Sequence, residues 1–460
     1  MTKEIRLNAF HMNSPGHSWP GLWAHPRDDS VHHDRPDYWI NLARTAERGK
    51  LDAVFLADVI GVYDVYGGSP DAAFRSGAQA PTLDPFSVVP LMSAVTENIG
   101  FGITATLTYE NPYLLARRFS TLDHLTNGRV AWNIVTGILD SGAKGAGQAG
   151  LADHDQRYLQ AEEYLDLTYQ LWEGSWADDA LAQDRASRIY SHPERVRRIA
   201  HHGAHYDLDA IHLVHPSPQR TPFLFQAGAS TAGRDFAAGH AEAVFINGHT
   251  KPLVAETVRD IRARSVTRGR RAQDVKVFLG ATVIVAASDA EAQAKLDEYA
   301  QWIDPQGALA LLSGWTGIDL SQYGLDEPIT HVKGRAMQSL IEAITIRSPD
   351  RRWTVRDLIG FGPVGGRGAF IVGSPETVAD ELQAWVAQSD VDGFNLTRLV
   401  VPESLEAIVD LLVPELQRRG VFKTEYAEGP LRQKFTGDAR LPDRHPAAQH
   451  RIASTLADAG

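Results

Sequence analysis

Residues 222–239, PFLFQAGASTAGRDFAAG, have the pattern in this chain that could hold an anion. A short apolar β run breaks at Gly228, and Ser230 and Thr231 are N-cap candidates for the helix that follows. A strand that turns at glycine into a capped helix leaves backbone N–H groups pointing outward, where the helix dipole attracts a phosphate. The same pattern also fits an ordinary strand-to-helix turn of an α/β fold.

Two other motifs could bind a dinucleotide or a metal ion, but the evidence for each is weaker. The run GAGQAG at 145–150 matches a dinucleotide-binding spacing, but it does not directly follow the strand that ends at Thr136, as that motif requires. His201, His202 and His205 have metal-like spacing in a predicted loop, where a solvated or hairpin histidine cluster fits better. The sequence therefore predicts no nicotinamide site and no metal site, and it contains neither a nucleophile elbow nor a P-loop.

The composition limits the class of protein. The chain has 460 residues, a net charge of −12, 43% hydrophobic residues and no cysteine. This acidic balance argues against nucleic acid or an anionic membrane as the main partner, and a basic run, RVRR at 195–198, fits a solvated helix face. No apolar run reaches membrane-spanning length, and the N-terminus lacks a signal-peptide core. The absence of cysteine excludes disulfides, thiolate zinc sites and cysteine nucleophiles, and fits a cytoplasmic protein.

Alternating apolar runs and amphipathic segments organise the chain. Strands are predicted at 5–10, 53–58, 100–107, 129–136, 222–226, 242–246, 276–285 and 392–398. Helices are predicted at 37–49, 85–97, 112–126, 156–173, from about 232, 288–302, 375–388 and 404–419. Eight strands with helices between them predict an α/β protein with a parallel (β/α)₈ TIM barrel, and a doubly wound open sheet is the alternative.

The barrel interpretation divides the chain and places its chemistry. Residues 1–420 form one barrel domain with insertions at about 137–221 and 303–365, the second of them irregular, and 421–460 form an extended C-terminal tail. Active sites of such barrels lie at the carboxyl ends of the strands. The candidate stretches are 10–17, 58–63, 104–108, 136–138 and 228–230.

Four long stretches resemble a known family. They are IRLNAFHMNSPGHSWPGLWAHP, AERGKLDAVFLADVIGVYDVYGG, ENPYLLARRFSTLDHLTNGRVAWNIVTG and HPSPQRTPFLFQAGAS. They resemble the bacterial luciferase-like flavin monooxygenases, in the branch that contains nitrilotriacetate, dibenzothiophene sulfone, long-chain alkane and dimethyl sulfide monooxygenases. The resemblance implies a TIM barrel, reduced FMN (FMNH₂) and O₂ as co-substrates, a separate NAD(P)H:flavin reductase, and a homodimer or homotetramer.

The resemblance also assigns the cofactor site. The turn at Gly228, Ala229 and Ser230 becomes the phosphate cradle, and Tyr158 resembles the phosphate-contacting tyrosine of the family. The residues at strand ends where the family holds the flavin ring and ribityl chain are Asp58, Thr104, Thr136 and Gly137. Without the resemblance, Asp58 could merely cap the next segment and Tyr158 could be a surface aromatic residue.

The reaction that the family implies passes through a flavin C4a-(hydro)peroxide, which needs a dry pocket and a proton source or hydrogen bonds. His17 is the best candidate for that role, because an unperturbed imidazole can donate or accept a proton near neutral pH. Tyr63, the second catalytic candidate, and Gln79 match polar positions near the substrate in the alkane branch. His17 could instead be a structural histidine, and Tyr63 a packed wall residue.

Three departures from the alkane branch bear on the substrate. Ser14 stands where that branch has a cysteine, and Ile138 and Leu311 stand where it has histidines. These substitutions predict a more apolar pocket, which disfavours alkane hydroxylation and also a multiply charged substrate, because buried carboxylates need paired cations. The stretches LLSGWTGIDLSQYGLDEP and RRWTVRDLI look more like the dimethyl sulfide branch.

The expected function is therefore FMNH₂-dependent monooxygenation of a small, largely apolar compound, and an organosulfur compound such as dimethyl sulfide is a candidate substrate. The alternatives are a long-chain alkane or aminopolycarboxylate monooxygenase of the same branch, a flavin or deazaflavin oxidoreductase that does not insert oxygen, and a flavin-binding barrel without catalysis.

Overall fold

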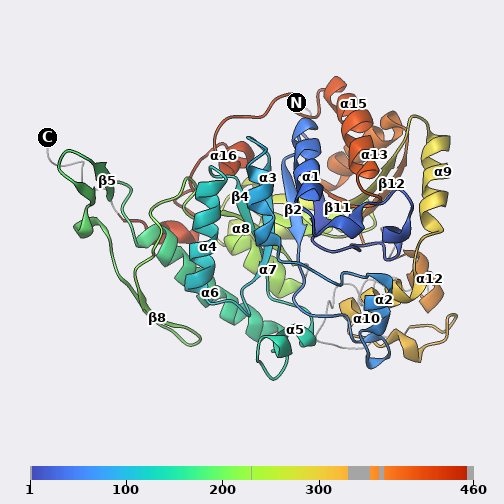
Figure 1. Ribbon diagram of the computed structural model, residues 1–460, viewed down its shortest axis with the longest axis horizontal. Coiled ribbons are helices and arrows are strands. Elements are labelled where there is room, and N and C mark those ends of the chain that lie inside the picture. The colour runs from blue at the N-terminus through green and yellow to red at the C-terminus, as the bar shows by residue number, and fades with distance from the viewer. Residues whose placement is uncertain (1–2, 229, 330–352, 362–366, 453–460) are drawn as a thin grey trace.

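The computed structural model describes residues 3–228, 230–329, 353–361 and 367–452. Eight parallel strands close into a barrel at its centre (Figure 1). In chain order these are β1 (Arg6–Met12), β2 (Ala53–Ala57), β3 (Gly100–Thr106), β4 (Val130–Val135), β9 (Phe223–Ala227), β10 (Ala243–Ile246), β11 (Lys276–Val285) and β13 (Gly393–Thr397).

Pairing between β10 and β11 closes the sheet, which decides between the two predicted folds. β1 pairs with both β2 and β13, and β11 pairs with both β10 and β13, so every barrel strand has two neighbours. A ninth strand, β12 (Ala369–Gly373), pairs with the second half of β11. The TIM-barrel prediction is confirmed, and the open doubly wound sheet is excluded.

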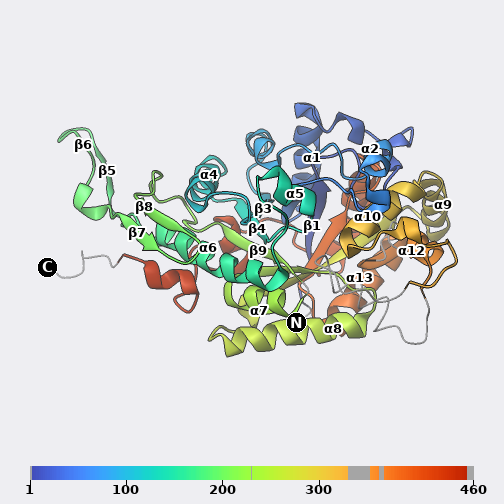
Figure 2. The same cartoon turned by 90° about the horizontal axis from the view of Figure 1, so that it is seen from below.

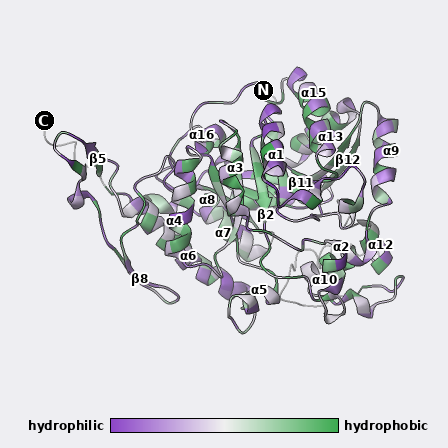
Figure 3. Ribbon diagram, in the orientation of Figure 1, coloured by the Kyte–Doolittle hydropathy of each residue, from purple (hydrophilic) through white to green (hydrophobic). Residues whose placement is uncertain are grey.

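Helices surround the barrel in both views (Figures 1 and 2). They are α1 (Pro36–Arg48), α3 (Val89–Ser93), α4 (Pro112–Leu125), α6 (His154–Gly174), α7 (Thr231–His240), α8 (Lys251–Thr267), α9 (Asp289–Ala300), α13 (Pro375–Ser389), α14 (Glu403–Ala407) and α15 (Val413–Arg418). The hydrophobic colour of Figure 3 gathers on the central strands, and outer helices such as α9 carry much hydrophilic colour.

Local signals explain where several of these helices begin. Asn111 caps α4, because its side chain accepts hydrogen bonds from the backbone N–H groups of Tyr113 and Leu114. Ser230 caps α7 by accepting from the N–H of Gly233 at 3.0 Å. The helix predicted at 85–97 is shorter than expected, since only 89–93 is α-helical after a 3₁₀ turn.

The two insertions carry structure of their own. The first contains α5 (Asp140–Gly145) and two hairpins, β5 (Leu181–Asp184) with β6 (Ile189–Ser191) and β7 (Ile199–His202) with β8 (Asp207–Ala210). The second was expected to be irregular, but its described part contains α10 (Pro305–Thr316), and α12 (Val355–Phe361) follows. α10 was not predicted because nearly all its residues are buried, so its sequence lacks the alternation of apolar and polar faces that identifies a surface helix. The remaining residues of this insertion, 330–352 and 362–365, lie outside the described part.

The predicted C-terminal tail is not free. Residues 421–452 have little regular structure apart from α16 (Leu431–Thr436) and a 3₁₀ turn, as expected, but they pack across the N-terminal end of the barrel. Phe435 contacts Phe223 and Phe278 inside the barrel, with ring centroids 4.9 and 6.0 Å apart.

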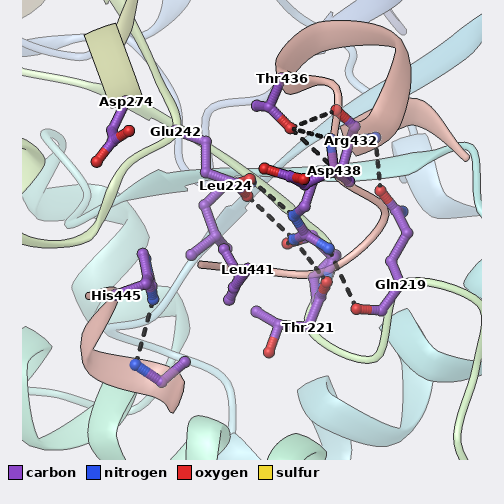
Figure 4. Close-up of polar contacts among 12 residues, drawn as sticks. Gln219, Thr221, Leu224, Glu242, Asp274, Arg432, Thr436, Asp438, Leu441 and His445 are labelled. Atoms are coloured by element: carbon purple, nitrogen blue, oxygen red, sulfur yellow. Dashed lines mark hydrogen bonds and ion pairs between the residues drawn. The ribbon is translucent and has the colours of Figure 1, made fainter. Parts of the chain in front are cut away.

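Arg432, on α16, is fully buried beneath the barrel (Figure 4). Its Nε donates to Oε1 of Glu242 at 2.7 Å, and its Nη2 donates to the carbonyl of Thr221 at 2.8 Å. This buried ion pair fastens the C-terminal segment to the start of β9 and β10.

Candidate active site

A cavity of about 170 Å³ lies at the carboxyl ends of the strands, between the barrel and the helices that cover it. Phe10, Phe55 and Phe245 line its inner end, where their rings meet edge to face at 5.0–5.8 Å. Trp315 of α10 and Tyr63 line its outer part. Six of the predicted site residues lie in its wall: His17, Asp58, Tyr63, Gln79, Thr104 and Ile138.

A chain of hydrogen bonds runs along one wall of this cavity. The indole of Trp315 donates to the hydroxyl of Tyr63 at 3.1 Å, and that hydroxyl donates to Oε1 of Gln79 at 2.7 Å. The side-chain amide of Gln79 then donates to the main-chain carbonyl of His17 at 2.9 Å. Burial raises the pKa of Tyr63 to about 12, so its hydroxyl keeps its proton at neutral pH. The network holds the loop that carries His17 in place.

The pKa of His17 differs from that of the unperturbed imidazole expected from the sequence. Burial, with smaller contributions from the charges of Arg398 and Arg367, holds the pKa of His17 well below its usual range. Its ring lies edge-on against Phe10 at 4.4 Å, and its Nδ1 has no hydrogen-bond partner among the described residues. His17 is therefore neutral at pH 7, where it can hydrogen-bond but cannot act as a cationic acid.

Asp58, at the end of β2, titrates near neutrality instead. Burial raises its pKa to about 7, and the nearby carboxylates of Asp84 and Glu110 add to the effect against one opposing hydrogen bond from the N–H of Val59. A side chain whose pKa lies near the working pH suits proton transfer. From the sequence, Asp58 is expected only to contact the cofactor.

Arg367 makes the cavity less apolar than the sequence predicted. Its guanidinium lies over the ring of Trp315, 4.2 Å from the centroid, and both residues line the cavity. Burial lowers the pKa of Arg367, although an arginine remains charged at neutral pH. The prediction of a more apolar pocket did not include this cation, because Arg367 comes from the segment just before β12, which no sequence signal links to the site.

A second group of predicted residues surrounds the N-terminus of α7. Burial raises the pKa of Tyr158, and the side chains of Ser230, Thr136 and Gln226 near its hydroxyl oppose that rise. His154, one turn earlier on α6, lies 3.1 Å from Oγ of Ser230 through its Nε2. Val135 and Ala227, which line the cavity, directly precede Thr136 and Gly228, so this group adjoins the cavity.

This group fits a flavin phosphate. A Cβ built on Gly228 would lie 2.3 Å from the side-chain nitrogen of Gln226 and 3.1 Å from the hydroxyl of Tyr158, so a larger residue there would push these two side chains aside. Arg157 donates to the carbonyl of Gly137, which has a positive φ of 76°, and brings a cation close to Tyr158. Hydroxyl donors, a helix N-terminus and a nearby cation are the groups that bind phosphate.

Two predicted substrate residues do not reach the cavity. The hydroxyl of Ser14 donates to the carbonyl of Gly16 at 2.6 Å, so it is turned toward its own backbone. Leu311 is buried in the apolar cluster that also contains Tyr63, and Trp315, four residues later on the same face of α10, occupies the cavity wall instead. Ala229 lies outside the described residues.

The cavity is also lined by polar residues that were not predicted, namely Ser18, Asn133, Asn247, Thr282, Arg367 and Thr397. Asn133 donates through Nδ2 to Oγ1 of Thr104 at 2.8 Å, and its Oδ1 is buried without a partner among the described residues. An asparagine within the apolar run VAWNIVT is a signal that could have identified this position.

A closed parallel barrel with a cavity at the carboxyl ends of its strands is the arrangement in which barrel enzymes carry their active sites. The profile of the luciferase-like monooxygenase family matches residues 10–392. The chain belongs to this family and is a flavin-dependent monooxygenase.

Individual relatives match over nearly the whole chain. The dimethyl-sulfide monooxygenase of Hyphomicrobium sulfonivorans is 45% identical over 98% of this chain and 95% of its own length. The long-chain alkane monooxygenase of Geobacillus thermodenitrificans is 43% identical over 99% of this chain and 100% of its own. The crystal structure of the Hyphomicrobium protein covers 98% of this chain and 96% of its own with a TM-score of 0.91. A riboflavin lyase crystallised with modified FMN is 35% identical, with a TM-score of 0.92 and coverage of 98% and 100%.

No helix in the described ranges is both long and apolar enough to span a bilayer. The histidine cluster considered for metal binding lies on the β7–β8 hairpin, where His201 pairs with Glu163 and His202 pairs with Asp207. The run RVRR at 195–198, expected on a helix face, lies instead in a 3₁₀ turn and the extended chain between the two hairpins.

Proposed function

We propose that this chain is the oxygenase component of a two-component monooxygenase. It takes FMNH₂ from a separate NAD(P)H:flavin reductase and uses O₂ to oxidise a small organic compound, for which an organosulfur compound such as dimethyl sulfide is the first candidate. The observation that carries the proposal is a cavity at the carboxyl ends of the strands that adjoins a candidate phosphate cradle. The 45% identity to a dimethyl-sulfide monooxygenase supports the substrate class.

Ser230, Tyr158 and the first turn of α7 would hold the phosphate of the flavin. Asp58, Thr104, Thr136 and Gly137 would hold its ring and ribityl chain, with Asn133 beside them. The bound reduced flavin supplies the electrons that activate O₂.

The remaining cavity residues would exclude water and provide proton donors. Phe10, Trp315 and Ile138 would keep water away from the bound flavin. The carboxyl group of Asp58 can hold or release a proton near pH 7, and the hydroxyl of Tyr63 stays protonated as a hydrogen-bond donor. His17, neutral in its buried site, contributes hydrogen bonding rather than charge.

The cavity also bears on the alternative substrates. One cation, Arg367, faces the cavity among the described residues that line it, which suits at most a single acidic group and disfavours an aminopolycarboxylate. A long-chain alkane remains the second candidate because of the 43% identity to an alkane monooxygenase.

The test is a coupled assay with a purified FMN reductase, NADH and ¹⁸O₂. We expect product labelled with ¹⁸O only when oxygenase, reductase, FMN and substrate are all present, and no NAD(P)H oxidation by the chain alone. Stoichiometric NADH oxidation by the purified chain would refute the two-component proposal. A tightly copurifying deazaflavin, without ¹⁸O incorporation into any of a panel of sulfides, sulfones, alkanes and amines, would favour an oxidoreductase that does not insert oxygen.

A further inference from the structure

The backbone fixes the position of the arginine that lines the cavity. Arg367 immediately precedes Gly368 and β12, and β12 pairs with the second half of β11. A Cβ built on Gly368 would lie 1.9 Å from the carbonyl oxygen of Gly280 on β11, so the chain can approach β11 this closely only with glycine at that position. Gly280 and Gly368 both line the cavity. The close approach therefore brings Arg367 to the cavity wall.

The side chain of Arg367 lies against an aromatic residue that is itself fixed. The guanidinium carbon lies 4.2 Å from the ring centroid of Trp315. The indole of Trp315 donates to the hydroxyl of Tyr63, which donates in turn to Gln79. These contacts restrict the rotamers of both side chains, so less conformational entropy is lost when a ligand binds. Five N–H donors in one plane suit the guanidinium to bidentate binding of a carboxylate or a sulfonate.

The charged side chains divide the cavity into two regions. The charge of Arg367 contributes to the lowered pKa of His17, so its field reaches the wall that carries this histidine. Asp58 lies closer to other carboxylates, because Asp84 and Glu110 add to the rise of its pKa. A single anionic group is therefore attracted to the region around Arg367, whereas a second one is disfavoured around Asp58.

The inner end of the cavity is apolar and aromatic. The rings of Phe10, Phe55 and Phe245 meet there edge to face. Methyl groups and a thioether sulfur make favourable contacts with such rings. A neutral sulfide would cover the guanidinium of Arg367 without adding an anion, whereas a sulfide with an acidic group would pair with this cation as water leaves the cavity.

We infer that the substrate is a thioether with one acidic group, and that Arg367 determines this specificity by binding the carboxylate or sulfonate. The thioether lies against the phenylalanine rings, and the acid lies against the guanidinium. The inference rests on the proposed function, because the sulfide class comes from the relationship to a dimethyl-sulfide monooxygenase. It narrows that class from small organosulfur compounds in general to monoanionic ones.

The first test compares four sulfides in the coupled assay with FMN reductase, NADH and ¹⁸O₂. They are (methylthio)acetate, its uncharged isostere (methylthio)acetamide, the dianion (methylthio)succinate, and dimethyl sulfide. We expect kcat/KM for (methylthio)acetate to exceed that for each of the others by at least about tenfold, because a site built for a charged group rejects analogues that lack it. An equal or higher kcat/KM for the amide would overturn the inference.

Variants of Arg367 assign the preference to this side chain. Arg367→Met removes the charge but keeps an unbranched side chain, and should lower kcat/KM for the acid at least about thirtyfold more than for the amide. Arg367→Lys should restore part of the preference, because it restores the charge without the planar donors. Arg44→Met removes an exposed arginine on α1 and should leave the preference unchanged. Equal losses for acid and amide in Arg367→Met would overturn the inference.

Binding measurements separate this inference from the proposed function. Calorimetric titration of the FMN-loaded chain without reductant should give at least about tenfold tighter binding of (methylthio)acetate than of the amide, and Arg367→Met should abolish the difference. Such a preference without ¹⁸O product from any sulfide would support the ligand specificity and refute the oxygenase proposal. Oxygenation of the sulfides without a charge preference would refute the specificity alone. Weaker FMN binding by Arg367→Met would also overturn the inference, because the guanidinium would then contact the cofactor.

Discussion

The buried ion pair beneath the barrel allows a sharp stability prediction for Arg432→Met. Arg432 donates to both oxygens of Glu242, at 2.7 and 3.0 Å, and to the carbonyls of Gln219, Thr221 and Pro222 at 2.8–3.1 Å. Methionine keeps much of the volume but leaves the carboxylate of Glu242, 3% exposed, without its cation. Removing one partner of a buried pair costs about 3–5 kcal/mol.

We therefore expect the free energy of unfolding of Arg432→Met to fall by about 3–5 kcal/mol. The measurement is urea unfolding followed by both circular dichroism and tryptophan fluorescence, since coincident transitions justify a two-state treatment. The exposed neighbour on α16 provides the control, and Gln433→Met should change stability by less than about 0.5 kcal/mol.

The double variant Arg432→Met, Glu242→Met separates the cost of an orphaned charge from the value of the pair. Replacing both partners by apolar residues should recover part of the loss, because no uncompensated charge remains, while the carbonyls of Gln219, Thr221 and Pro222 still lack the donor that Arg432 supplied. The reasoning fails if Arg432→Met stays within about 1 kcal/mol of wild type, or if the double variant is no more stable than the single one. Turnover of folded protein should not change, since the pair lies at the opposite end of the barrel from the cavity.

Three further predictions concern the candidate site. Tyr158→Phe should weaken FMN binding about tenfold, as expected for loss of one hydrogen bond to a charged group, and riboflavin should bind equally to both proteins; equal losses in calorimetric titrations of the two flavins would exclude a phosphate contact. Asp58 holds its proton in the folded state up to a pKa of about 7, above the 3.8 of a free carboxyl, so wild-type stability should fall between pH 4 and 7 by at most about 4 kcal/mol. Asp58→Asn should therefore match wild type near pH 4 and exceed it at pH 8 in urea unfolding, and parallel pH profiles would contradict the raised pKa. His17→Ala should uncouple the reaction, with hydrogen peroxide replacing at least 90% of the product while FMN affinity changes little; an unchanged coupling ratio with lower thermal stability would make His17 structural.

Local information in the sequence determined the elements of this fold. The buried runs around residues 53–57, 100–106 and 130–135 are continuous and apolar, as strands covered on both faces must be, so each was located to within two residues. The cap at Asn111 and the turn before α7 were also recognisable, because a capping side chain and its helix are neighbours in the chain. The residues that follow the predicted strands were therefore good candidates for the cavity wall, because closure of a parallel barrel brings the carboxyl ends of its strands together.

Only the tertiary structure decided which of these residues face one another and how acidic they are. Arg367 enters the cavity from the segment before β12, and Arg432 anchors a stretch that has no periodicity. The pKa of His17 is lowered, and that of Asp58 is raised to about 7, mainly by burial. Desolvation sums the atoms that surround a group from every direction, most of them supplied by residues far away in the chain, and no local pattern records that sum.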